Sequence, residues 1–190
     1  PNAALESVFG NLVADAQLLA TRSPEDGGAQ LSFMNPGGLR ADLVPDEQGL
    51  VRYGQLYAVQ PFGNQLVVKT FTGAQIRAVL EQQFASGGNT VQRPRVLSVS
   101  SGFSYRYDLA QPAGARISHM VLNGAPLTDT QWVRVVMSSF LDSGGDNFTV
   151  LTQGQDRRVG ELDLDALEAY FRQQSPVPPP ATDRITRVGR

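Results

Sequence analysis

The sequence predicts a single α/β domain of mixed β-sheets flanked by helices. Amphipathic helical patterns occur in the first half of the chain and near its end, whereas the middle is dominated by strand-like segments. No internal repeat or interior linker divides the 190 residues. A chain of this length with 41% hydrophobic residues buries a core without disulfides. We therefore expect one domain over residues 1–190.

The first elements are a helix and a short strand. Apolar residues recur at three- and four-residue steps from Leu5 to Thr21, which predicts an amphipathic helix with Asp15 towards its solvent side. Leu31–Met34 is typical of a short buried strand. It runs directly into the loop Asn35–Arg40, where two glycines let the backbone turn and approach a ligand. The apolar positions of the helix are Val8, Leu12, Val13, Ala16 and Leu19.

A helical turn, a strand and a second helix follow. Tyr53–Val59 predicts a short helical turn that Pro61 ends, because proline cannot continue a helix. Leu66–Phe71 has the β-branched and apolar content of a buried strand. Thr72 is a suitable N-cap for a helix to about Phe84.

The rest of the chain predicts several strands and a last helix. Asn123-Gly124 is a hairpin signal. Leu162–Gln173 is amphipathic, with Leu164, Leu167, Tyr170 and Phe171 expected to face inward, and a proline-rich segment then leads to a terminal strand at Ile185. The expected strands are Val96–Val99, Gly102–Leu109, Ile117–Leu122 and Trp132–Met137.

Composition excludes several classes of function. A net charge of −2 without a Lys/Arg run argues against a nucleic-acid surface, because such proteins concentrate positive charge on one face. The absence of cysteine excludes thiolate chemistry. No apolar stretch approaches the roughly 20 residues that span a bilayer, so we expect no membrane span. The sequence begins at Pro1 without a leader pattern, which indicates a mature protein or an excised piece.

Two segments share an arrangement that suits a flat ligand. Val59–Asn64 reads VQPFGN and Ser138–Phe148 reads SSFLDSGGDNF. Each places an aromatic side chain beside permissive glycine and a polar group, which is what a site for a polar-edged ring requires. The pair indicates a slot for a nucleobase.

Two further motifs make a family resemblance specific. Gly10–Ala16 reads GNLVADA and Met34–Arg40 reads MNPGGLR. Together and in this order, the four motifs resemble the C-terminal, substrate-binding domain of the 5'-nucleotidase family, which includes UDP-sugar hydrolases and 2',3'-cyclic phosphodiesterases. The similarity runs from about Glu6 to the DRIT string near the end. The resemblance implies a four-layer α/β/β/α domain.

The resemblance assigns roles to residues that have ordinary explanations when taken alone. Phe62 and Phe140 correspond to two aromatic plates that stack on both faces of a base, although each alone also fits a core phenylalanine at a turn. Asp146 corresponds to the aspartate that accepts from the ribose hydroxyls, although a turn aspartate that bonds its own backbone is the ordinary alternative.

Further contacts carry over in the same way. Arg40 faces the substrate in the family, although a solvated surface arginine is the alternative, and Asn35 and Asn64 supply amide contacts to the base and its surroundings. The loops that support these residues contain Gly37, Gly38, Gly63, Gly144 and Gly145.

Two departures from the family pattern stand out. Pro36 replaces a glycine that most relatives have, which removes a backbone N–H and stiffens the loop. The arginine that usually precedes the Gly-Asn motif is missing from the region of Ala3 and Leu5. Part of the phosphate or ribose clamp is therefore expected to be absent or replaced.

The resemblance also implies where the chemistry lies. Family members hydrolyse phosphoesters with two divalent metal ions, such as Zn or Mn, held by an N-terminal metallophosphoesterase domain. This chain carries one histidine, His119, which we expect to be structural or half-exposed, and none of the ligand strings of a dimetal centre. We therefore expect no catalytic residue and no metal site here, and a partner domain elsewhere in the same protein.

The expected function is substrate binding for a 5'-nucleotidase-type hydrolase of nucleotide catabolism, with a nucleotide or nucleoside as ligand. The expected location is periplasmic, cell-surface or secreted, in a bacterium. Alternatives of the same architecture are a 2',3'-cyclic phosphodiesterase, a UDP-sugar hydrolase and a sulfur-ester hydrolase. A free-standing, non-catalytic nucleoside-binding module is an alternative from a different class.

Overall fold

The computed structural model describes residues 1–189 and contains two β-sheets whose facing sides share one hydrophobic core. The strands of the larger sheet follow the order β10-β2-β9-β1-β5. β1 and β9 are parallel, and the other neighbouring pairs are antiparallel. The strands are β1 (Leu31–Met34), β2 (Gln65–Thr72), β5 (Ser98–Val99), β9 (Trp132–Ser138) and β10 (Gln155–Leu162).

The smaller sheet has the order β11-β6-β7-β8, in which only β11 and β6 are parallel. A separate two-stranded hairpin joins β3 and β4. The strands are β6 (Phe103–Asp108), β7 (Ile117–Leu122), β8 (Ala125–Pro126), β11 (Ile185–Val188), β3 (Ala85–Ser86) and β4 (Asn89–Thr90).

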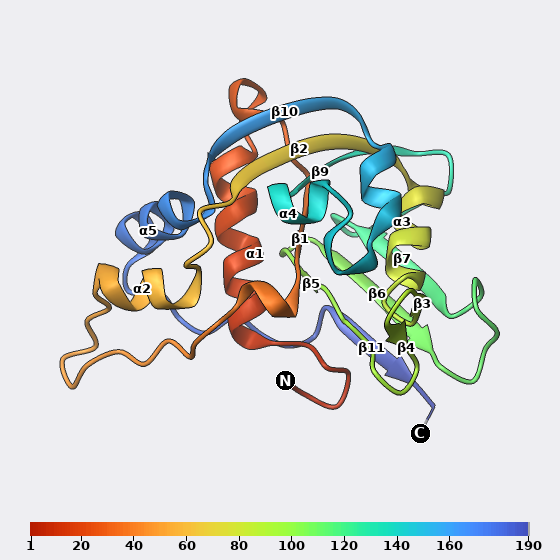
Figure 1. Ribbon diagram of the computed structural model, residues 1–190, viewed down its shortest axis with the longest axis horizontal. Helices are drawn as coiled ribbons and strands as arrows, with labels where there is room; N and C mark the ends of the chain where they lie inside the picture. Colours follow the sequence, from red (N-terminus) through yellow and green to blue (C-terminus); the bar gives the residue numbers. More distant parts are fainter. Residues whose placement is uncertain (190) are drawn as a thin grey trace.

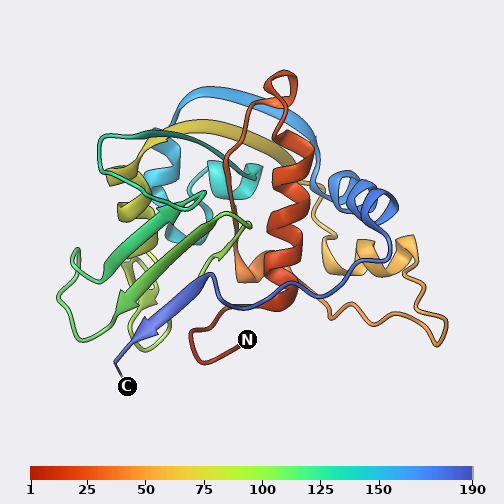
Figure 2. The ribbon, with the colours of Figure 1, turned by 180° about the vertical axis from the view of Figure 1, so that it is seen from behind.

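Helices cover the larger sheet and complete the core. Apolar residues of α1 pack against α2 and α5, and α1 and α5 also contact the face of β2 and β9. Buried residues of α3 join the core between the two sheets. Figure 1 shows α1 beneath β2 and β10, and Figure 2 shows the smaller sheet on the opposite side of the molecule from α2 and α5. The helices are α1 (Val8–Thr21), α2 (Tyr53–Val59), α3 (Gly73–Glu81), α4 (Ser139–Asp142) and α5 (Asp163–Gln174).

The prediction of an α/β fold with mixed sheets flanked by helices is confirmed. The strand at Leu31–Met34, the helical turn at Tyr53–Val59 and the hairpin at Asn123-Gly124 have the predicted positions. Thr72 caps α3, since its hydroxyl accepts from the backbone N–H of Gln75. In residues 1–189, no helix has the length and apolar character needed to cross a bilayer.

Two predictions about the first helix were wrong. α1 begins at Val8 instead of Leu5, because Leu5 has a positive φ of 62° and the Ser7 hydroxyl accepts from the N–H of Gly10. Asp15 does not lie on a solvent face. Its carboxylate accepts from both terminal nitrogens of Arg184 at 2.8 and 2.7 Å, with side-chain exposures of 13% and 11%.

Three other elements are shorter than predicted. The strand expected over Val96–Val99 covers Ser98–Val99, and the one expected over Gly102–Leu109 covers Phe103–Asp108. The helix expected to reach Phe84 ends at Glu81. β10 was not predicted at all: every residue of this edge strand is exposed, so it lacks the apolar alternation that reveals a half-buried strand.

Candidate functional site

A cavity of about 310 Å³ lies at one end of the larger sheet. Three of the four segments that line it are brought together by strand direction. β1 and β9 are parallel, so their carboxyl ends meet at the same edge, and β2 is antiparallel to β9, so β2 starts there. The register pairs Leu66 of β2 with Ser138 of β9. The edge beyond the carboxyl ends of parallel strands is a common place for ligand sites.

All six side chains that the sequence predicted as binding residues line this cavity. Gly37 and Gly38 line it as well, together with Arg95, which the sequence did not single out. The six residues are Asn35, Arg40, Phe62, Asn64, Phe140 and Asp146. The fold therefore brings together residues that are up to 111 positions apart in the sequence, such as Asn35 and Asp146, which form a hydrogen bond.

The two aromatic rings of the cavity are held on short, constrained segments. Phe62 is 55% exposed and follows Pro61, and the next residue is Gly63 with a φ of 63°. Phe140 is 43% exposed and lies on the single-turn helix α4. Both rings line the same cavity, so their exposed faces are available to a ligand there.

Arg40 and Phe62 lie together on one wall. The guanidinium carbon of Arg40 is 5.8 Å from the centre of the Phe62 ring, within the range of a cation–π contact. The backbone N–H of Arg40 donates to the carbonyl of Val59, which ties the loop after β1 to the end of α2. Within residues 1–189 no carboxylate forms an ion pair with Arg40, so its fork donors are free for an anionic group.

Asp146 is the most constrained residue of the cavity. Its φ of 55° lies in the left-handed region, which costs a non-glycine residue energy unless its surroundings impose it. The Asn89 amide donates to the Asp146 carbonyl at 2.8 Å. The Asn35 amide donates to Oδ2 at 2.8 Å, and Arg95 Nη1 lies 2.9 Å from Oδ1. These contacts fix the carboxylate, which is 13% exposed, at the cavity wall.

Asn64 is held by hydrogen bonds to two residues that do not line the cavity. Its amide nitrogen donates to Asp163 Oδ2 at 3.2 Å, and the Ser139 hydroxyl donates to its Oδ1 at 3.4 Å. Asp163 is the first residue of α5 and is 3% exposed. Burial raises the pKa of the Asp163 carboxyl, against the opposing effect of the Asn64 hydrogen bond.

The predicted glycines divide into two groups. Gly37 and Gly38 line the cavity, and a Cβ at Gly38 would lie 2.5 Å from the Met34 methyl group. Gly63, Gly144 and Gly145 do not line it. A Cβ at Gly145 would lie 2.5 Å from a ring carbon of Phe140 and 2.6 Å from the Phe140 carbonyl oxygen, so this glycine lets the loop pass close to the ring.

The two departures from the family pattern have different consequences. Pro36 fits without strain, because it is the first residue of the 3-10 turn Pro36–Gly38, a position where the missing N–H is not needed. Neither Ala3 nor Leu5 lines the cavity. Arg95 supplies a guanidinium that is 45% exposed. Nothing in the sequence distinguishes it from Arg93, two residues earlier in the same polar loop.

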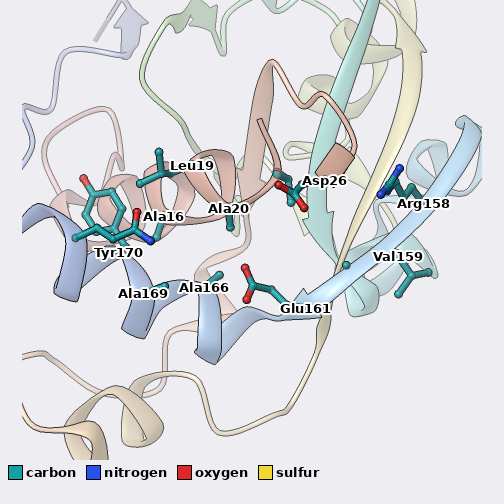
Figure 3. Close-up of a pocket in the computed structure, with 13 residues that line it drawn as sticks. Ala16, Leu19, Ala20, Asp26, Arg158, Val159, Glu161, Ala166, Ala169 and Tyr170 are labelled. Carbon is teal, nitrogen blue, oxygen red and sulfur yellow. The ribbon is translucent and has the colours of Figure 1, made fainter. Parts of the chain in front are cut away.

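A second hollow, of about 520 Å³, lies between α1, α5 and β10 (Figure 3). Its walls carry the alanines Ala16, Ala20, Ala166 and Ala169, with Glu161 and Asp26 near one end. Burial, Asp165 and Asp26 together raise the pKa of Glu161. The hollow also has Arg158 and one aromatic ring, Tyr170, but none of the six predicted binding residues lines it, so the smaller cavity is the candidate site.

No group of three or more His, Cys, Asp or Glu side chains is placed to hold a metal ion within residues 1–189. His119 is exposed and has a φ of 50° in β7, in the smaller sheet. The residues of the described chain therefore do not fit a two-metal centre.

Comparisons with known proteins agree with the cavity's motifs. The family model described as "5'-nucleotidase, C-terminal domain" matches residues 1–153. The chain is 32% identical to a 5'-nucleotidase-related protein of Glossina morsitans morsitans, covering 96% of the chain and 35% of that protein. It is 32% identical to the cell wall protein Lmo0130 of Listeria monocytogenes, covering 89% and 21%.

A solved structure gives the same result. The 5'-nucleotidase precursor from Thermus thermophilus superposes with a TM-score of 0.83 at 36% identity, covering 97% of the chain and 36% of that structure. The chain thus spans about a third, or less, of the length of the proteins that it matches here.

Proposed function

The chain belongs to the family of 5'-nucleotidase C-terminal domains, and from this premise we propose that it is the substrate-binding part of a metal-dependent 5'-nucleotidase-type phosphohydrolase. In this proposal the cavity holds a nucleotide and presents its phosphate to a separate catalytic domain. One observation carries it: six predicted binding side chains, from three segments distant in the sequence, line a single cavity.

The base binds between Phe62 and Phe140 in this proposal. A cavity of about 310 Å³ is at the lower end of the range of small-molecule sites, which is appropriate for a domain that supplies only part of the binding surface. Stacking on an aromatic ring contributes about 1–3 kcal/mol per base. The amides of Asn35 and Asn64 line the same cavity, and in this proposal they contact the polar edge of the base and its surroundings.

The sugar and phosphate bind to charged groups in this proposal. Asp146 retains unused lone pairs beside its contacts with Asn35 and Arg95, and a carboxylate with free lone pairs accepts from ribose hydroxyls. Arg40 presents an unpaired fork to phosphate or ribose oxygens. This chain therefore contributes orientation, which raises the rate by placing the phosphate correctly.

Bond cleavage belongs to a different part of the protein in this proposal. The described residues do not fit a dimetal centre. We propose that two divalent ions in an N-terminal metallophosphoesterase domain supply the activated water that attacks phosphorus. The chain spans about a third of the Thermus nucleotidase precursor and of the Glossina relative, which leaves room for such a domain. We also propose an exported or surface location, in keeping with the cell wall relative.

Titration calorimetry with AMP, adenosine and ribose 5-phosphate tests the binding proposal on this chain. We expect AMP to bind more tightly than ribose 5-phosphate, because only AMP carries a base. Equal affinities, or no binding of AMP, would contradict the proposal. A panel of nucleoside monophosphates, 2',3'-cyclic nucleotides, UDP-sugars and sulfur esters on the full-length protein then identifies the substrate.

A further inference from the structure

A buried lysine lies behind the aromatic cavity and outside its lining. Lys69 is in the middle of β2 and is 5% exposed. Its ammonium nitrogen lies 2.5 Å from Asp142 Oδ1, and the two side chains are 7% and 9% exposed. It also donates to the carbonyls of Leu151 at 3.2 Å and Thr152 at 3.5 Å. A lysine that is buried this deeply requires partners for its charge, and here all of them come from other segments.

Asp142 ends the helix that carries Phe140. α4 has only four residues, Ser139–Asp142, and its N-terminus is capped by the Ser138 hydroxyl. A single helical turn is not stable by itself, so its position depends on its tertiary contacts. The other Asp142 oxygen, Oδ2, accepts from Arg157 Nε on β10 at 2.8 Å. The Asp142 carboxylate therefore connects α4 to both β2 and β10, the two strands that cross above α4 in Figure 1.

Phe140 is separated from Asp142 by one residue on the same turn. Any rotation or shift of α4 about Asp142 therefore moves the Phe140 ring at the cavity wall. Lys69 lies on a strand that is paired along its length with β9, so it is a fixed point from which the turn is held. Phe62, the opposite ring, precedes the same strand β2. β2 thus contains Lys69, which holds the turn of Phe140, and begins shortly after Phe62.

Stability alone does not explain the buried pair. A buried ion pair often contributes no net stability compared with apolar residues of similar volume, because both charges lose their hydration. We propose that Lys69 is a positioning residue: through Asp142 it sets the place of Phe140 and hence the width of the slot for the base. This inference rests on the proposed binding of a base between Phe62 and Phe140.

The double variant Lys69→Met/Asp142→Asn tests this role. Methionine retains the length of the side chain without its charge, and asparagine retains an oxygen for Arg157, so no orphan charge remains. We expect AMP to bind about tenfold more weakly, a loss within the range of one stacking contact. Ribose 5-phosphate, which lacks a base, should bind as it does to the unmodified chain, to within about twofold, and the melting temperature should change little.

A matched control is the surface pair Arg77–Asp129, which joins α3 to the loop before β9 at 2.8 Å, with side chains 31% and 59% exposed. Arg77→Met/Asp129→Asn should leave both affinities unchanged. Should the double variant of the buried pair fail to fold, Lys69→Met alone allows the same comparison of AMP with ribose 5-phosphate, because Asp142 then keeps its ion pair with Arg157.

Two results would overturn the inference. One is an unchanged affinity for AMP in a folded variant, and the other is an equal loss for AMP and ribose 5-phosphate, which indicates general damage to the site. Phe140→Ala separates this outcome from a failure of the proposed function. If Phe140→Ala weakens AMP and the Lys69 variant does not, only the positioning role is wrong; if neither does, the aromatic slot itself is wrong.

Discussion

Arg95 and Asp146 form an ion pair across the cavity wall, with 2.9 Å between Arg95 Nη1 and Asp146 Oδ1. Arg95 is in the loop before β5, and Asp146 is in the glycine-rich turn after α4. The positive charge of Arg95 offsets the negative charge of Asp146 in a cavity that is proposed to bind an anion. Arg95 is 45% exposed, so the pair is expected to contribute little to stability.

Arg95→Gln should weaken AMP binding by about threefold to tenfold, because Asp146 then repels the phosphorylated ligand. The loss should be larger for AMP than for adenosine, which has no charge. Calorimetry at low and high salt measures it, and the difference between the two ligands should shrink as salt increases. Arg93→Gln is the matched control, since Arg93 is exposed and does not line the cavity. Equal losses for the two ligands would assign Arg95 to loop structure.

Asp146→Asn in the full-length enzyme should raise the KM for ribonucleotides more than for 2'-deoxyribonucleotides, which lack one hydroxyl for the carboxylate to accept. The substituted side chain retains an oxygen for Arg95 or Asn35, so the turn is expected to persist. Steady-state kinetics with AMP and dAMP measure the effect. The same increase for both would mean that Asp146 holds the loop, and that the sugar contact lies elsewhere.

Phe62→Ala and Phe140→Ala should each weaken AMP binding by about 1–3 kcal/mol. The double variant should lose less than the sum, because each ring stacks through the base against the other. A double-mutant cycle by calorimetry gives the coupling. Trp132→Ala is a control for the removal of an exposed aromatic residue, since Trp132 is 53% exposed at the start of β9 and does not line the cavity. Unchanged affinity in both single variants would eliminate the clamp.

The isolated chain should neither hydrolyse AMP nor bind catalytic metals stoichiometrically. Its described carboxylates and its one histidine do not gather into a site for two cations. Metal analysis after incubation with Zn²⁺ or Mn²⁺, and a phosphate-release assay, check this expectation. Stoichiometric metal together with phosphate release would place the chemistry in this chain.

Three of the four motifs contribute residues to the cavity, and each of the three lies where a strand meets a loop; the fourth, Gly10–Ala16, lies inside α1 and does not line the cavity. Phe62 lies between a proline and a glycine, and Phe140 lies close to serines and glycines. Such local patterns can be recognised in the sequence alone. Arg95 and Lys69 were not visible in this way. Arg95 resembles any loop arginine, and Lys69 is a single charge within an apolar strand whose partner, Asp142, lies 73 positions later in the chain.

The fold shows the same division. Periodicity located α1 and α5 because their buried faces repeat every three to four residues. It placed Asp15 on a solvent face, since no local signal indicates that Arg184, 169 residues away, covers that position. β10 has no buried face, and its pairing with β2 is made through backbone groups that sequence patterns do not report. Features that depend on local sequence patterns were therefore predictable, whereas those that depend on long-range ion pairs or on backbone pairing between strands were not.

The pH dependence of stability should report the state of Asp163, the residue behind Asn64. Burial raises its pKa above the usual 3.8, so the folded chain holds this proton more tightly than the unfolded chain. The stability that Asp163 contributes is therefore present at low pH and is lost as pH rises through the folded pKa. Asp163→Asn removes the titration and retains an oxygen for the Asn64 amide.

We expect the melting temperature of the unmodified chain, minus that of Asp163→Asn, to fall as the pH rises above 3.8 and then to level off. The carboxyls of Asp46 and Asp108, whose pKa values hydrogen bonds lower, give the opposite trend, but both proteins share them and their effect cancels in the difference. Differential scanning calorimetry at steps across this range measures it. A difference that stays constant or grows with pH would show that Asp163 is ionised at no cost in the folded state, and Asn64 would then be held by a permanent carboxylate.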